Sequence, residues 1–136
     1  MADVIATEHA AAGELTVFFL APQAICRLHK RFFGDPSLTD CISFPQDGDQ
    51  DSDEDGDARA APYTSLGEIF VCPRAAIDYC QKLGGDPYRE TTLYIVHGLL
   101  HLLGYDDIDP RARRKMRQKE RVHMERLESK GLLLSP

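Results

Sequence analysis

Residues 91–104 of the chain read TTLYIVHGLLHLLG, a mostly apolar stretch. A helix with this sequence is apolar on nearly every side, which is typical of a helix buried in the middle of a domain. Pro87 suits the first turn of such a helix, and Gly104 is a natural stop at its C-terminal end. We therefore predict a central buried helix over residues 87–103.

The segments around this helix predict the rest of the fold. Short runs rich in β-forming residues predict strands over 14–20, 39–44 and 65–71. Prolines followed by apolar residues at helical spacing predict further helices over 22–32, 73–83 and 110–130, the last with Asp109 as its N-cap. Strands in the first half and helices in the second predict an α+β fold, a small mixed sheet packed with about four to five helices.

Length and composition indicate one domain. The 136 residues, 43% of them hydrophobic, suffice for one core, so we expect a single domain over residues 1–136. No apolar run approaches the ~18 residues of a membrane span, and the N-terminus lacks the pattern of a signal peptide. We therefore expect no membrane partner and a cytoplasmic location.

The formal net charge of −6 is local in origin. Of the 22 acidic residues, seven lie between Asp47 and Asp57, and the other 15 nearly balance the 16 basic residues. Asp51 begins a partial match to a calcium-binding EF-hand loop, but the twelfth position, which should supply a glutamate, is Pro62. Because its acidic groups repel one another and few apolar residues anchor it, we predict that segment 46–61 is a disordered loop.

Two histidines on the central helix indicate a metal site. His97 and His101 are four residues apart, so both imidazoles project from one helical face. Gly104 then turns the chain, and Asp107 falls where zinc sites of this spacing carry their third ligand. Histidines at this spacing are often incidental, but burying two of them on an apolar helix favours coordination. We predict a metal site of His97, His101 and Asp107 on the central helix.

The other histidines lack such a setting. We expect His9, His29 and His123 to lie at the surface or to be partly packed.

The same residues carry a family resemblance. Residues 97–107, HGLLHLLGYDD, resemble the signature HGxLHLxGYDH of the bacterial YbeY family at every position but the last. Residues 39–45, TDCISFP, are similar to the TDVLSFP strand of that family, and Gly67-Glu68-Ile69 resembles its GDI strand. Two departures stand out: Asp107 replaces the last histidine of the signature, and Phe33 stands where the family usually has an arginine.

The resemblance implies a function. It implies a zinc-dependent endoribonuclease, with one Zn²⁺ per chain, that acts on single strands in rRNA processing, near the 3′ end of the small-subunit RNA, during ribosome biogenesis. Its implied partners are ribosomal RNA, the small ribosomal subunit and a ribosome-associated protein. The alternative is a non-catalytic, metal-stabilised ribosome-assembly factor that binds RNA or a ribosomal protein. A peptidase of the HExxH type is disfavoured, because Gly98 stands where such enzymes have glutamate.

Further residues are expected to serve this activity. Glu68, which matches the acidic residue of the GDI strand, is the candidate for proton transfer. Contact with RNA requires cations, and the first predicted helix offers Arg27, Lys30 and Arg31. The last predicted helix carries a second basic cluster: Arg111, Arg113, Arg114, Lys115, Arg117, Lys119 and Arg121.

Overall fold

A computed structural model describes residues 1–8, 13–46 and 64–136. Within these residues the chain forms one three-stranded sheet in the order β1-β3-β2, from β1 (Gly13–Phe19), β2 (Cys41–Pro45) and β3 (Thr64–Val71). β1 pairs with β3 in parallel, and β2 pairs with β3 in antiparallel fashion. The predicted small mixed sheet is confirmed.

Five helices accompany the sheet in the described residues. They are α1 (Ala2–Thr7), α2 (Pro22–Phe33), α3 (Pro73–Leu83), α4 (Pro87–Leu102) and α5 (Pro110–Ser129). The last four begin with proline, as predicted, since the missing N–H of proline is not needed in the first turn. The Asp109 side chain accepts a hydrogen bond from the Ala112 N–H at 2.8 Å, which confirms Asp109 as the N-cap of α5. The short helix α1 was not predicted.

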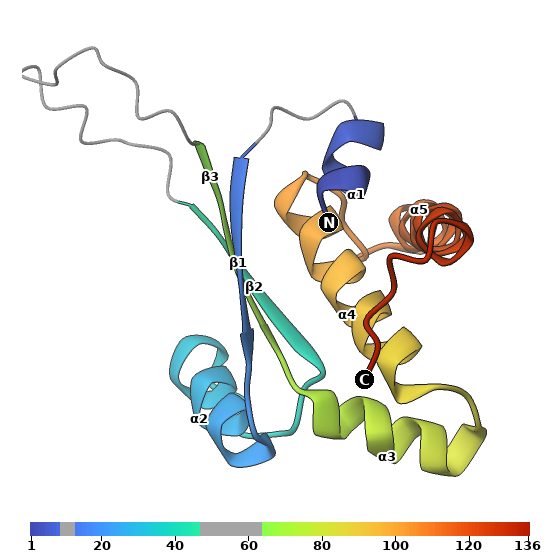
Figure 1. Cartoon of the computed structure of the whole chain (residues 1–136). Coiled ribbons are helices and arrows are strands. Elements are labelled where there is room, and N and C mark those ends of the chain that lie inside the picture. The colour runs from blue at the N-terminus through green and yellow to red at the C-terminus, as the bar shows by residue number, and fades with distance from the viewer. Residues whose placement is uncertain (9–12, 47–63) are drawn as a thin grey trace, which may run out of the picture.

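The two faces of the sheet meet different helices (Figure 1). Ile69 and Val71 of β3 belong to the core shared with α4 and α5. Phe70 alternates with them and belongs to a smaller cluster with Ile25 of α2 and Ile42 of β2. Because side chains alternate along a strand, the residues of β2 and of β3 from Glu68 onward can be assigned to the α4 face or the α2 face.

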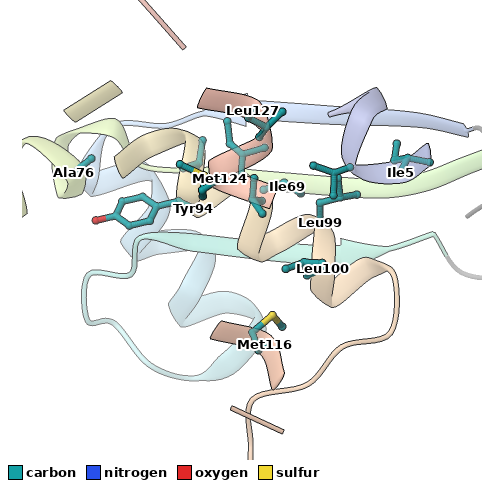
Figure 2. Close-up of a cluster of buried hydrophobic side chains, with 13 residues drawn as sticks. Ile5, Ile69, Ala76, Tyr94, Leu99, Leu100, Met116, Met124 and Leu127 are labelled. Carbon is teal, nitrogen blue, oxygen red and sulfur yellow. The ribbon is translucent and has the colours of Figure 1, made fainter. Parts of the chain in front are cut away.

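The main core is centred on α4 (Figure 2). Leu99 and Leu100 are fully buried and belong to the same cluster as Ile69 from the sheet and Met124 and Leu127 from α5. α4 is buried along most of its length, as its all-round apolar sequence predicted. This burial fixes the helix that carries both predicted metal-binding histidines.

Gly98 lets α4 lie directly on the sheet. A Cβ atom added there would stand 2.9 Å from the Cys41 Sγ and 3.1 Å from the Ile69 Cγ2, closer than packed side chains allow. The helix therefore approaches β2 and β3 closely between His97 and His101. This contact sets the position of both imidazoles relative to β2.

The structure describes two of the three histidines that lie outside the predicted metal site. The expectation for His123 is wrong: its side chain is fully buried, because its Nε2 pairs at 2.5 Å with the Glu8 carboxylate, which follows α1. His29 is partly buried, as expected. His9 and nearly all of the acidic segment 46–61 lie outside the described residues.

No helix among the described residues is both long and apolar enough to cross a membrane.

Candidate metal centre

The three predicted ligands come together in the structure. His97 Nε2 and His101 Nε2 are 3.1 Å apart, and Asp107 Oδ2 lies 3.6 Å from the first and 3.7 Å from the second. Ligand atoms at about 2.0–2.1 Å from a tetrahedral Zn²⁺ are about 3.3 Å from one another. The triangle formed by these atoms therefore has the size of one face of a tetrahedral zinc site, and the cluster can hold a metal ion.

The turn after α4 brings Asp107 to the histidines. Gly104 has a φ of 101°, a backbone conformation that favours glycine, and it reverses the chain. Asp106 Oδ1 then accepts hydrogen bonds from the backbone N–H of Asp107, at 2.6 Å, and of Ile108, at 3.1 Å. Asp106 thus orders the loop, which leaves the Asp107 carboxylate as the group that faces the imidazoles.

Hydrogen bonds on the far side of each imidazole fix its orientation. The Tyr105 carbonyl can only accept, so His101 Nδ1 donates to it, at 3.1 Å. His97 Nδ1 donates to Glu120 Oε1 of α5 at 2.5 Å. In a neutral imidazole whose Nδ1 donates, Nε2 carries the lone pair that binds a metal. Both rings therefore present a metal-binding nitrogen to the same point.

The hydrogen bond between His97 and Glu120 also shifts the pKa of His97. The Glu120 hydrogen bond raises the pKa of His97 above its ordinary value, and partial burial opposes this effect less strongly. The Glu120 side chain is 17% exposed, against 31% for His97, 29% for His101 and 39% for Asp107. The proposed ligands are thus open to solvent on one side, while the residue that orients His97 is more deeply packed.

Two hollows flank the ligands. The first, of about 270 Å³, lies between α4 and α5, and its lining includes His97, Asp107, Glu120, Arg113 and Arg117. Asp40 and Glu90 also line it.

The second hollow, of about 340 Å³, lies between the end of α2, β2 and α4. Its lining includes His97, His101, His29, Phe33 and Ser43. Because His97 lines both hollows, a metal ion held there would be reachable from either side.

The structure does not bring Glu68 together with the three ligands. Glu68 pairs in register with Phe44, which belongs to the α2-side cluster, whereas the neighbouring Ile69 contacts α4. The exposed Glu68 side chain therefore lies on the opposite face of the sheet from His97.

The predicted basic residues are distributed differently from the ligands. Arg27, Lys30 and Arg31 are exposed on α2, and the side chains of α2 that line the second hollow are His29 and Phe33. From the basic cluster of α5, Arg113 and Arg117 line the first hollow.

Glu120 was missed by the sequence analysis. A signal was present, because Glu120 is four residues from both Met116 and Met124, which are buried on the inner face of α5. An acidic residue on the apolar face of a helix indicates a buried partner. The partner itself could not be named, because His97 lies 23 positions earlier in the chain.

Comparison with known proteins identifies the family of the chain. The profile of the family described as Endoribonuclease YbeY matches residues 2–128. A protein of Protochlamydia amoebophila (strain UWE25) named Endoribonuclease YbeY is 45% identical over 132 residues, which cover 97% of this chain and 82% of that protein. One of the same name from Chlamydia abortus is 42% identical over 125 residues, covering 90% and 74%.

A solved structure shows a likeness of fold. The solution structure of a Thermotoga maritima protein aligns with a TM-score of 0.64 and 22% identity, over 94% of this chain and 76% of that one. The family profile covers nearly the whole chain, and the relatives exceed 40% identity, so the resemblance inferred from residues 97–107 is confirmed. The chain belongs to the Endoribonuclease YbeY family.

Proposed function

We propose that this protein is a zinc-dependent endoribonuclease that cleaves single-stranded segments of ribosomal RNA, in maturation of the small-subunit RNA near its 3′ end. The observation that supports it best is the convergence of His97 Nε2, His101 Nε2 and Asp107 Oδ2 on one point beside two hollows. Membership of a family of endoribonucleases supplies the reaction class.

The donor set favours one Zn²⁺ per chain. Two imidazole nitrogens and one carboxylate oxygen are a common protein contribution to catalytic zinc sites, which keep a fourth position open. The partly exposed side chains leave room for that position. When bound there, the ion supplies Lewis-acid chemistry: it polarises a phosphate oxygen and lowers the pKa of water.

The residues around the ligands suit a phosphodiester substrate. Arg113 and Arg117 line the first hollow, where guanidinium groups can hold phosphate oxygens next to His97. Glu120 and the Tyr105 carbonyl hold the two imidazoles in place during the reaction. A ribosomal RNA substrate implies the small ribosomal subunit as partner, as the resemblance predicted, and it fits the cytoplasmic location expected from the sequence.

Two acidic residues are candidates for proton transfer. The role predicted for Glu68 stays a prediction, and Glu90 is a second candidate because it lines the first hollow with His97. Burial raises the pKa of Glu90 above its ordinary value, and nearby Arg89 opposes this shift. Glu68→Gln and Glu90→Gln separate the two candidates: the variant that keeps zinc but loses cleavage identifies the proton-transfer residue.

The proposed activity is tested with rRNA fragments. Protein supplied with one equivalent of zinc should cleave single-stranded fragments and spare duplexes of the same sequence. Protein stripped with a chelator should not cleave, and readdition of zinc should restore activity. An Asp107→Ala variant, purified in the same way, controls for contaminating nuclease.

Two outcomes would overturn the enzyme proposal. Equal cleavage by the stripped protein and by Asp107→Ala would show that the activity does not come from this site. Zinc and RNA binding without cleavage would favour the non-catalytic assembly factor.

A further inference from the structure

We infer that the second hollow is a nucleobase subsite, in which an unpaired base of RNA stacks on the ring of Phe33 next to the metal-binding histidines. This inference rests on the proposed function, because it names how the same site holds its substrate. Phe33 and the metal-binding pair His97 and His101 line one hollow of about 340 Å³. Its volume lies within the about 300–1,000 Å³ that small-molecule sites occupy.

Phe33 presents an aromatic surface to this hollow. Phe33 is the last residue of α2, and 59% of it is exposed. Gly34 follows with a φ of 70° and donates its N–H to the Lys30 carbonyl at 2.9 Å, which ends the helix and holds the position of Phe33. The ring is also supported from inside by Phe44, with centroids 6.3 Å apart and planes inclined by 23°. The supported ring of Phe33 can therefore stack against a second planar group.

His29 and β2 provide polar groups around the ring. His29 Nδ1 donates to the Ser37 carbonyl at 2.9 Å, which fixes the imidazole and leaves its Nε2 as an acceptor in the neutral ring. The His29 ring centroid is 5.6 Å from that of Phe33. Thr39 and Ser43 of the β2 side add hydroxyl groups to the lining. A base stacked on Phe33 can therefore form hydrogen bonds along its edge.

The charge next to Phe33 favours a nucleic acid as the occupant. Arg27, Lys30 and Arg31 are exposed on the same helix, and none of them forms an ion pair within residues 1–8, 13–46 and 64–136. Cations attract the phosphates, and an aromatic ring accepts an unstacked base. This combination is typical of sites for single-stranded nucleic acids, since a paired base cannot leave its stack without an energetic cost.

The inference is tested by the fluorescence of a stacked base. The probe is a single-stranded 2′-O-methyl oligoribonucleotide carrying 2-aminopurine, which resists cleavage and is quenched on stacking. Binding to the full-length protein should quench the probe. Phe33→Leu, which keeps an apolar side chain but removes the π face, should lose most of the quenching. It should also weaken single-strand affinity roughly 5- to 100-fold, whereas Phe33→Tyr should behave like the parent.

Phe19 offers a matched control. It is 54% exposed and lines a different hollow with Pro73 and Tyr88, so Phe19→Leu should change neither quenching nor affinity. Unchanged quenching and affinity in Phe33→Leu would overturn the subsite while leaving the proposed function intact if that variant still cleaves rRNA fragments. An equal loss in Phe19→Leu would also overturn it, because the effect would not come from the second hollow. If the parent bound no RNA at all, the proposed function would fail together with the subsite.

Discussion

At the residue scale, one hydrogen bond to each imidazole decides which of its two nitrogens is able to bind a metal. The same imidazole can bind a metal or merely pack, and the difference lies in which nitrogen carries the proton. Glu120 and the Tyr105 carbonyl accept from the Nδ1 atoms of His97 and His101, so both Nε2 atoms keep a lone pair that a metal ion could use. The hydrogen bonds to the Nδ1 atoms are therefore needed for metal binding in addition to the spacing of the histidines.

Removal of Glu120 should weaken metal binding without unfolding the protein. Glu120→Leu is expected to lower zinc affinity by about 10- to 100-fold, because the orientation and basicity of His97 depend on this contact. Glu120→Gln should lose less, since an amide oxygen still accepts from Nδ1. Competition with a chromophoric chelator measures the affinity. Glu125→Leu, at an exposed position of α5, is the control and should bind zinc like the parent.

The two aspartates of the loop should differ in their effect on zinc. Asp107→Ala should weaken zinc binding by more than about 100-fold, beyond the range for outer contacts, because it removes a proposed ligand. Asp106→Ala should weaken it less, since Asp106 orders the loop through backbone N–H groups. Asp107→His should retain zinc and shift cleavage to lower pH, because a neutral ligand leaves the ion more electrophilic. Equal zinc affinity in Asp107→Ala and the parent would exclude Asp107 as a ligand.

At the element scale, buried polar contacts join the end of α1 to α5 and to the turn after α4. The Glu8 carboxylate, 8% exposed, accepts hydrogen bonds from the Tyr105 hydroxyl and the His123 Nε2, each at 2.5 Å, and lies 3.3 Å from the Lys119 Nζ. Because Tyr105 lies between His101 and Asp107, this cluster supports the loop that completes the site. Neither α1 nor the burial of His123 was predicted from the sequence, because the contact between Glu8 and His123 joins residues 115 positions apart.

The Glu8 cluster should make stability depend on pH. Burial alone would raise the pKa of Glu8, but hydrogen bonds from Tyr105, His123 and Lys119 outweigh it and hold the pKa below its ordinary value of 4.5. A lowered pKa stabilises the fold fully above the unfolded-state value, and the contribution is lost as pH falls through the folded-state value. Glu8→Gln should therefore be less stable than the parent by about 1–2 kcal/mol at pH 7.

Urea unfolding of both proteins from pH 7 to pH 3 checks this expectation. The difference in unfolding free energy should persist down to about pH 5 and shrink at lower pH. A difference that stayed constant over the whole range would show that the charge of Glu8 does not contribute.

The acidic segment should be dispensable for folding. β2 and β3 are antiparallel neighbours, with Pro45 paired to Gly67, so the ends that flank residues 47–63 lie next to each other. A short Asn-Gly turn of about four residues can join such strands. Replacing residues 47–63 in this way should leave the melting temperature and zinc affinity nearly unchanged. Loss of most of the thermal stability, or calcium-dependent stabilisation of the intact protein, would contradict this interpretation.

At the scale of the whole molecule, features that depend on residues close together in the sequence could be predicted. Features that depend on contacts between distant residues could not. His97, His101 and Asp107 lie within eleven consecutive residues, so helix periodicity and one glycine turn largely determine their geometry. The central helix, the strands and the mixed sheet were also predicted, because each has a local pattern. Placement of Glu120 beside His97, and of Glu68 on the other face of the sheet, depends on packing between distant elements. The two hollows arise only after that packing, so no local pattern indicates them.

We expect RNA cleavage to require one zinc ion, held by His97, His101 and Asp107. The test is stepwise addition of zinc to chelator-stripped protein, with the initial cleavage rate of a single-stranded rRNA fragment measured at each step. The rate should rise linearly and level off at one equivalent per chain for the parent, and stay at background for His97→Ala. A full rate without zinc, a break at another stoichiometry, or the same curve for His97→Ala would contradict the account.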